Sequence, residues 1–193
     1  AIDYDWIEWY HEKVRASDPR LNFTRTYGLY DSNRLIGIWS VEPKIMRNSN
    51  NDIIKVGRCF AVGISSEYRK MGLFVSLSEY AIKRERERGE YEYIIGFPQT
   101  GRAVIGGHLK AGWEEIAFND IYSIDLRFID GSFFRKDVNT VIDFSQIPNA
   151  LSPINSFDEP SSYRNIRYLM HPKLQYTIYT YGDAYIILKP YST

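Results

Sequence analysis

The fold is decided by the stretch ISSEYRKMGLFVSL, residues 64–77, in which a strand gives way to a helix through a glycine-bearing loop. The residues before it, Ile53–Ile64, are rich in β-branched and apolar side chains, which predicts a central strand. After it, apolar residues recur at helical spacing from Leu73 to Ala81, which predicts a helix. We expect this helix to run into a mixed charged segment and to stop at Gly89.

The loop in this stretch has the chemistry of an anion site. A helix that follows a buried strand presents unpaired N–H groups and the positive end of its dipole, so it can hold a diphosphate without net positive charge. Gly72 permits close backbone approach, and Arg69 and Lys70 can add charge-assisted contacts to phosphate oxygens. The Gly-Lys-Ser/Thr ending of a nucleoside-triphosphate loop is missing. A purely structural turn is the other interpretation of the same residues.

Periodicity and turn residues predict further elements on both sides of this stretch. They are a helix over Tyr4–Val14, a hairpin of strands Arg25–Tyr30 and Leu35–Val41, a polar loop over Met46–Asp52, a strand over Tyr91–Phe97, a helix over Gly101–Ala111, and one or two strands within Ile116–Phe128. The composition changes after Asp130-Gly131, and a Tyr-rich hairpin ends the chain. We therefore expect an α/β (α+β) domain over residues 1–130 and a β-rich extension over residues 131–193.

Composition excludes several classes of protein. The 24 Lys and Arg residues balance the 24 Asp and Glu residues, so the net charge gives no general attraction for nucleic acid or an anionic membrane. The charged run Lys83–Arg88 is interpreted as a solvated helix face. The single cysteine, Cys59, excludes an internal disulfide and fits a reducing compartment. No run of about 18 apolar residues is present, and the acidic start lacks the order of a signal peptide, so we expect a cytoplasmic protein.

Two motifs resemble those of the GNAT superfamily of acyl-CoA N-acyltransferases. Residues 66–74 resemble its diphosphate loop, which reads Arg or Gln, two residues, Gly, one residue, then Gly or Ala; Arg69 and Gly72 fit and Phe74 departs. The second motif has three parts. Gly-Phe-Pro-Gln over residues 96–99 looks like the family's strand that ends in Pro-Asn. A short helix follows, and Lys-Ala-Gly-Trp over residues 110–113 looks like the family's closing Lys-Leu-Gly-Phe. The chain is similar to members that acylate amino sugars in polysaccharide biosynthesis.

This resemblance implies a cofactor, acetyl-CoA or another acyl-CoA, and a way to hold it. Strands Ile53–Ile64 and Tyr91–Phe97 would run parallel and splay apart, with the pantetheine arm in the gap like an added strand. The residues implied in cofactor binding are Val62, Gly63, Ile64, Arg69, Lys70, Met71, Gly72, Leu73, Phe74 and Gln99. We assign no metal ligand.

The resemblance also points to His108 as the catalytic residue, because a tyrosine four residues before the closing Gly often serves as the acid in this family. Imidazole titrates near neutral pH, so His108 would protonate the thiolate or act as a base toward the substrate. The alternative is a helix-surface histidine with no catalytic role. No carboxylate stands out as the base, although a water chain to Glu92 or His11 stays open.

Other side chains carry weaker hypotheses. Cys59 lacks a motif-bound base and is interpreted as a small buried hydrophobe rather than an acyl-carrying nucleophile. The cluster Trp6, Trp9 and Tyr10 is expected to be core, with a lining of the acceptor pocket as the alternative.

The first strand and helix of the family fold have no counterpart before Trp6. The hairpin Tyr176–Leu188 is therefore expected to cover the sheet edge that this strand would occupy, within the chain or by exchange in a homodimer. The C-terminal segment is alternatively a partial second repeat.

These inferences predict an N-acyltransferase that moves an acetyl or other short acyl group from CoA to a primary amine of a small molecule or nucleotide-linked amino sugar. A non-catalytic acyl-CoA binder or protein-interaction module is the alternative. A third alternative is modification of a nucleic-acid base or a protein amine, against which the neutral net charge argues.

Overall fold

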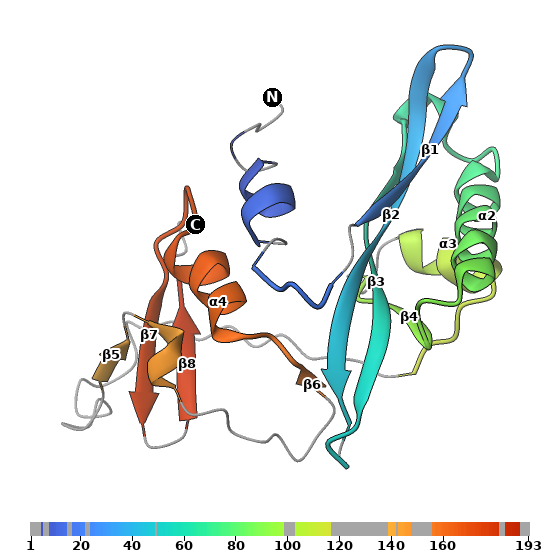
Figure 1. The fold of residues 1–193 in the computed structure, drawn as a ribbon. Coiled ribbons are helices and arrows are strands. Elements are labelled where there is room, and N and C mark those ends of the chain that lie inside the picture. Colours follow the sequence, from blue (N-terminus) through green and yellow to red (C-terminus); the bar gives the residue numbers. More distant parts are fainter. Residues whose placement is uncertain are drawn as a thin grey trace. The chain divides into compact units, whose positions relative to one another are not determined.

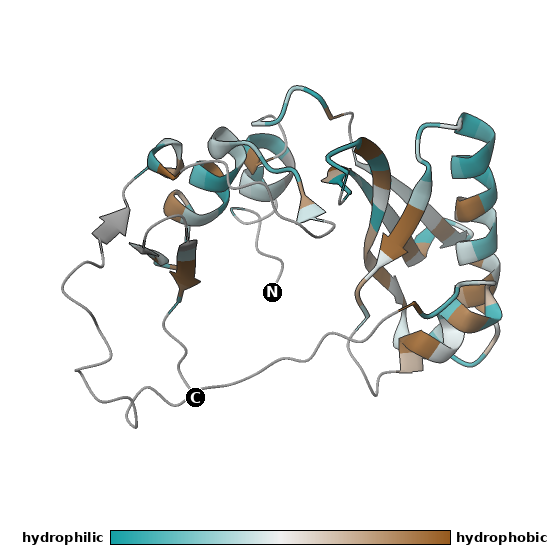
Figure 2. Cartoon of the chain, turned by 90° about the horizontal axis from the view of Figure 1, so that it is seen from below, coloured by the Kyte–Doolittle hydropathy of each residue, from teal (hydrophilic) through white to brown (hydrophobic). Residues whose placement is uncertain are grey.

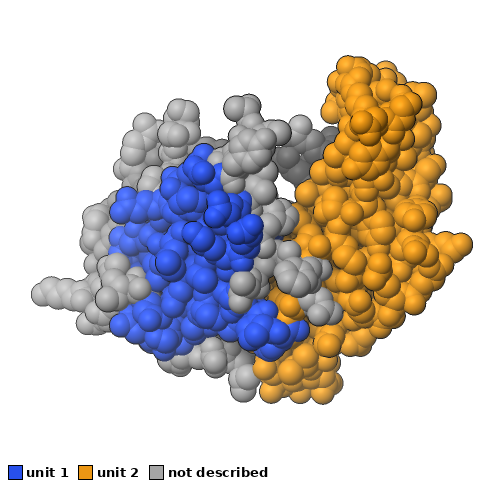
Figure 3. Space-filling view, turned by 45° about the horizontal axis from the view of Figure 1, so that its top comes forward, with its two compact units in different colours: residues 1–20, 118–152, 159–193 blue, residues 21–117, 153–158 orange. Residues whose placement is uncertain are grey.

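A computed structural model of the chain shows two compact units (Figure 3). Unit 1 comprises residues 1–20, 118–152 and 159–193, and unit 2 comprises residues 21–117 and 153–158. The structure describes residues 5, 8–14, 17–21, 24–48, 50–98, 103–116, 139–141, 143–147, 156–181 and 184–189. The domain boundary expected near residue 130 stays a prediction, and the strands expected within Ile116–Phe128 fall almost wholly outside the described residues.

Unit 2 is built on a mixed sheet with the strand order β1-β2-β3-β4 (Figure 1). Its strands are β1 (Arg25–Asp31), β2 (Arg34–Arg47), β3 (Ile53–Ile64) and β4 (Tyr93–Gly96). The short β6 (Ser156–Phe157) pairs with the C-terminal end of β2. The pairs β1–β2, β2–β3 and β2–β6 are antiparallel, whereas β3 and β4 are parallel. The predicted bounds of β3 and its parallel pairing with β4 are therefore confirmed.

Strand β2 is longer than predicted because it continues through a proline. The sequence suggested an end at Val41, yet β2 runs to Arg47 and takes the start of the predicted polar loop into the sheet. Proline has no N–H for a strand ladder and is tolerated where a strand has a free edge. Pro43 lies between the last β1 pair, at Val41, and the first β6 pair, at Met46. On that edge, no strand in the described part of the chain pairs with Pro43, so its missing N–H interrupts no ladder there.

Helix α2 (Leu73–Arg88) covers one face of this sheet and supplies the core of unit 2. Leu77 and Ala81 on the helix pack against a buried cluster of Trp39, Val41 and Cys59 on the strands. Hydrophilic residues, in teal, predominate along much of α2 in Figure 2, as expected for a helix with one buried side. Helix α3 (Ala103–Lys110) lies beside α2. Gly89 ends α2 in the left-handed conformation, φ 64°, as predicted.

The interpretation of Lys83–Arg88 as a solvated face is wrong at one position, Glu85. Its side chain is buried, while Lys83, Arg84, Arg86, Glu87 and Arg88 are exposed. Arg25 donates to both carboxylate oxygens of Glu85 at 2.8 and 2.5 Å, and the Tyr27 hydroxyl donates at 2.5 Å. Burial raises the pKa of Glu85, but the hydrogen bonds from Arg25 and Tyr27 outweigh it and leave that pKa below its usual range. This network fixes α2 to β1.

Unit 1 contains a second, three-stranded sheet in the order β5-β7-β8. Its elements are η1 (Trp9–Val14), β5 (Asn139–Val141), η5 (Phe144–Gln146), α4 (Ser161–Arg164), η6 (Asn165–Leu169), β7 (Thr177–Tyr181) and β8 (Ala184–Leu188). Phe144, Ile147 and Ile178 form its buried cluster. The predicted C-terminal hairpin is confirmed, since β7 and β8 pair antiparallel. It pairs with β5 in the sheet of unit 1, and the expectation that it covers an edge of the other sheet stays a prediction.

We expect Arg25→Met to lower the free energy of unfolding by on the order of 3 kcal/mol, because it leaves the buried Glu85 carboxylate without its cation. Urea unfolding at pH 7 measures the change. Arg84→Met is the matched control, since Arg84 pairs with Glu87 at 2.9 Å on the exposed side of the same helix and should lose less than about 1 kcal/mol. Equal losses in the two variants would contradict the role given to Glu85.

Candidate functional site

The site begins where the parallel ladder between β3 and β4 stops. The pairs run from Val56 with Tyr93 to Cys59 with Gly96, and β3 then continues to Ile64 without β4. On its other edge β3 stays paired with β2 as far as Ile64. The three strand residues predicted to hold a pantetheine arm, Val62, Gly63 and Ile64, lie in this half-paired stretch. Among the described residues, no strand pairs with them on the β4 side, where an added strand would bind.

A β-bulge bends β3 at the same place. Ser40 pairs with Phe60 and Ile38 with Gly63, so two residues of β3 stand opposite Trp39 alone. Ala61, inside the bulge, has φ 31°, a value that L residues rarely adopt. Bulges re-aim a strand and end its regular pairing. The bend therefore lies within the part of β3 that has no β4 partner.

The loop that follows β3 is anchored to the turn between β1 and β2. The Ser65 N–H donates to the Ile36 carbonyl at 2.8 Å. Within the short helix η2 (Ser66–Tyr68), the Tyr68 hydroxyl donates to Asp31 at 2.6 Å, and Glu67 pairs with Arg34 at 2.8 Å. These contacts tie the loop to the end of β1 and the start of β2.

The N-terminus of α2 is open toward this loop. Gly72 precedes the first helical residue with φ 76°, and a Cβ built on it would meet nothing within 4 Å. No side chain caps the helix; its first turn closes through Val75 and Ser76, whose N–H groups donate to the Gly72 carbonyl. The N–H groups of Leu73 and Phe74 have no acceptor in their own helix by its geometry. They are the donors that an anion would meet, together with the helix dipole.

The charged residues of the loop are exposed beside these amides. Arg69, Lys70 and Met71 all lie at the surface, with Met71 65% exposed. The Arg69 Nε donates to the Ile64 carbonyl at 3.2 Å, which ties the arginine to the end of β3. Lys70 has φ 66°, so the backbone turns sharply between the arginine and Gly72.

Phe74, which departs from the family motif, packs onto α3. A Cβ built on Gly107 would lie 2.6 Å from the Phe74 ring, so the ring sits against the backbone of that helix. The ring also meets His108 edge to face, with centroids 5.1 Å apart. The Phe74 side chain is thus engaged by α3. Gln99, the remaining residue implied in cofactor binding, lies outside the described residues.

His108 is buried in α3, so the helix-surface interpretation is wrong. It is 7% exposed and lies between the rings of Phe74 and Trp113, the latter with its centroid 4.6 Å away. Its Nδ1 is buried without a hydrogen-bond partner in the described part of the chain. Burial lowers the pKa of His108, so the imidazole is neutral at pH 7. A neutral imidazole suits the role of base better than that of acid.

The other side chains considered for the chemistry are Glu92, Cys59 and His11. The Glu92 N–H donates to the Lys55 carbonyl, near the start of β3. Val62–Ile64 lie seven to nine residues further along the strand, roughly 20–30 Å away. Cys59 is buried as expected, and burial raises its pKa to about 12, which keeps it a thiol. The side chain of His11 lies outside the described residues.

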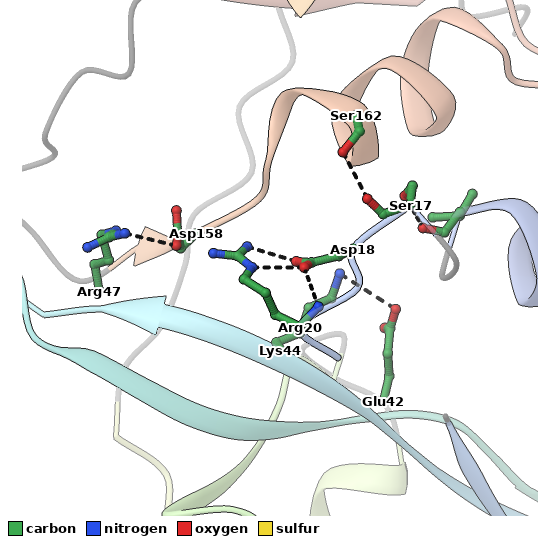
Figure 4. A network of polar contacts seen from close by, with 9 residues as sticks. Ser17, Asp18, Arg20, Glu42, Lys44, Arg47, Asp158 and Ser162 are labelled. Carbon is green, nitrogen blue, oxygen red and sulfur yellow. Dashed lines mark hydrogen bonds and ion pairs between the residues drawn. The ribbon is translucent and has the colours of Figure 1, made fainter. Parts of the chain in front are cut away.

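The sequence interpretation missed a buried carboxylate on β2, Glu42. It pairs with Arg58, its register partner on β3, and its Oε1 lies 3.5 Å from the Lys44 ammonium (Figure 4). Further along β2, Arg47 pairs with Asp158 at 3.2 Å in the same figure. Ser40, Glu42 and Lys44 alternate along β2 and so share one face of the sheet. This spacing would have predicted that Glu42 and Lys44 lie side by side, had β2 been predicted to continue past Val41.

Comparisons with known proteins find relatives in structure only. No family model and no curated protein matches the sequence. The structure of Eis1 from Mycobacterium abscessus is similar over 98% of this chain, with TM-score 0.55 and 14% identity, and this chain spans 52% of it. A transcriptional regulator from Bacillus halodurans C-125 matches with TM-score 0.49 and 14% identity, over 64% of this chain and 77% of that one. A glucosamine-6-phosphate N-acetyltransferase from Arabidopsis thaliana matches with TM-score 0.46 and 14% identity, over 65% and 81%.

The first of these likenesses shows the fold, and the predicted α/β fold with a GNAT-like mixed sheet and flanking helices is confirmed. Among the described residues, no helix is long and apolar enough to cross a membrane.

We expect Gly107→Ala to destabilise the protein by about 1–3 kcal/mol, because the new methyl group would overlap the Phe74 ring. Gly106→Ala is the matched control, since a Cβ there meets nothing within 4 Å and alanine favours a helix interior by about 1 kcal/mol. Thermal unfolding compares them. A loss at position 106 equal to that at 107 would refute the packing of Phe74 on α3.

We expect the burial of neutral His108 to make stability depend on pH. Because its folded-state pKa is lowered, the unfolded chain binds the proton at a higher pH than the folded chain. This contribution is complete above the ordinary histidine pKa, about 6.5, and is lost as pH falls toward the lowered value. Urea unfolding between pH 5 and 8 should show a shallower acid loss for His108→Gln than for the wild type. Parallel pH profiles would contradict it.

Proposed function

We propose that the protein is an N-acyltransferase that moves an acetyl or other short acyl group from CoA to a primary amine of a small molecule or nucleotide-linked amino sugar. The observation that carries this proposal is the order of three features along one stretch of chain. The half-paired end of β3 leads into an anchored loop, and the loop leads into an uncapped helix N-terminus. A ligand with an extended thiol-bearing arm and a diphosphate at its end fits this order. The arm would bind the β3 backbone like an added strand, and the diphosphate would accept from the N–H groups at the start of α2.

The residues that would hold the cofactor divide into two groups. Backbone groups of Val62, Gly63 and Ile64 would bind the arm on the edge that β4 leaves free. The N–H groups of Leu73 and Phe74, with Arg69, Lys70, Met71 and Gly72 beside them, would bind the diphosphate. Bound acyl-CoA would supply a thioester carbonyl open to attack. The protein's part is to orient it, because alignment turns a bimolecular attack into an effectively unimolecular one.

His108 is the proton carrier in this proposal. An ammonium group must lose a proton before its nitrogen can attack, and the departing thiolate must gain one. The neutral imidazole beside the first turn of α2 supports the base role, either directly or through water. The proton it accepts is then available to the thiolate.

The same proposal includes three further predictions. Gln99 would contribute to cofactor binding, the protein would be cytoplasmic, and the C-terminal hairpin would form a homodimer.

A non-catalytic acyl-CoA binder is the second candidate, favoured by one observation. His108 is enclosed by Phe74 and Trp113, so its access to a substrate depends on those two rings. In such a protein the cofactor would bind without turnover. Release of free thiol from acetyl-CoA, measured across a panel of primary amines that includes amino sugars, nucleotide-linked amino sugars and lysine peptides, separates the candidates and identifies the acceptor class.

We expect Arg69→Ala to raise the KM for acetyl-CoA about tenfold, since a hydrogen bond to a charged group is worth about 1.5–3 kcal/mol and 1.4 kcal/mol is tenfold in affinity. His108→Gln should instead lower kcat about 100-fold or more and leave cofactor affinity unchanged. Arg86→Ala, on the exposed last turn of α2, is the control and should alter neither. Binding without thiol release from any amine would establish the second candidate, and absence of binding would refute both.

A further inference from the structure

One face of the β3–β4 ladder is closed at the point where the ladder stops. Cys59 packs with Leu77 and Ala81 of α2 in the core of unit 2. Trp113 packs against the same core and covers Gly96, the register partner of Cys59. In the proposed function the diphosphate binds beyond the end of β3, so the thioester end of the arm reaches back toward this last pair. The body of the acceptor must therefore lie on the opposite face, with its nitrogen reaching into the gap.

Two side chains of β3 stand on that opposite face, next to the last pair of the ladder. Neighbouring residues of a strand alternate between its faces, so Arg58 and Phe60 lie opposite to Cys59. The central carbon of the Arg58 guanidinium lies 5.9 Å from the centroid of the Phe60 ring. The guanidinium therefore extends along β3 toward the end of the ladder. The Arg58 side chain is 27% exposed, so solvent reaches it.

A buried carboxylate anchors this arginine. Arg58 pairs with Glu42 of β2, whose side chain is only 3% exposed. Glu42 also lies 3.5 Å from the ammonium group of Lys44, whose side chain is equally buried (Figure 4). One carboxylate is thus shared by two cations, and the three side chains carry a net charge of +1. Arg58 is the most exposed of the three, so it presents this charge to solvent.

An arginine anchored in this way suits an anionic group of a ligand. A guanidinium has five N–H donors in a planar fork, so it can bind a carboxylate or a phosphate while it retains Glu42. Because the side chain is already ordered, less conformational entropy is lost when that anion binds. Arg58 and Phe60 are roughly 7 Å apart along the strand. The anion would therefore lie only a few bonds from the reacting nitrogen.

We propose that the acceptor is a primary amine that carries a carboxylate or a phosphate a few bonds from its nitrogen, and that Arg58 binds this anionic group. The inference rests on the proposed function, because that function fixes where the thioester lies. It narrows the acceptor class to anionic amines and removes neutral amino sugars from the preferred acceptors.

Titration calorimetry of the full chain, in a solution that contains CoA, tests the proposal without turnover. The probes are phosphoethanolamine and β-alanine, each compared with its neutral-group analogue, ethanolamine or β-alaninamide. We expect at least one anionic probe to bind about tenfold more tightly than its analogue, and the two pairs distinguish phosphate from carboxylate. Arg58→Met should abolish this preference. Lys55→Met is the matched control, because it removes a charge from an exposed position of the same strand and should keep the preference.

Arg58→Lys keeps a cation beside Glu42 and so guards against a loss of fold, which thermal unfolding checks. It lacks the planar fork, so its preference should fall between those of the wild type and Arg58→Met. Equal binding of charged and neutral probes by the wild type, or an unchanged preference in Arg58→Met, would overturn the proposal.

Thiol release from acetyl-CoA with the same four amines separates this inference from the proposed function. Release with equal kcat/KM for the charged and neutral amines would overturn the inference alone. Absence of release with these amines and with the wider amine panel would overturn the proposed function, whatever the calorimetry shows at Arg58.

Discussion

The candidate site depends on one constraint, which is that the parallel ladder between β3 and β4 ends before β3 does. Strand backbone needs hydrogen-bond partners, and β3 has them on the β2 side as far as Ile64 but on the β4 side only as far as Cys59. Trp113 covers Gly96, the last paired residue of β4, from one face of the sheet, because a Cβ built on Gly96 would lie 3.3 Å from its ring. In the described part of the chain, no other strand pairs with that edge of β3.

The helices fix the rest of the site relative to that edge. Phe74 joins the first turn of α2 to α3 through Gly107 and His108. The loop before α2 is held from the other side by Asp31 and Arg34 of the β1–β2 turn. Contacts from both sides therefore position the amides at the start of α2. Such preorganisation lowers the ordering cost of binding an anion.

Much of this could be predicted from the sequence, because local patterns determine it. The bounds of β3, the glycine before α2 and the stop at Gly89 follow from apolar content and left-handed backbone positions. What could not be predicted depends on partners distant in the chain. β2 passes through Pro43 where neither β1 nor β6 pairs with it, and Glu85 is buried because Arg25 and Tyr27 reach it. The burial of His108 likewise requires Phe74 and Trp113.

The central claim is that the free edge of β3 and the start of α2 together receive one extended ligand. Amide hydrogen exchange with and without CoA tests it most directly, since both groups of amides are read in one experiment. The account predicts that CoA slows exchange at Val62–Ile64 and at Gly72–Phe74 together, while amides of the β7–β8 hairpin in unit 1 are unchanged. Unaltered exchange in both segments at saturating CoA, or protection confined to unit 1, would contradict it.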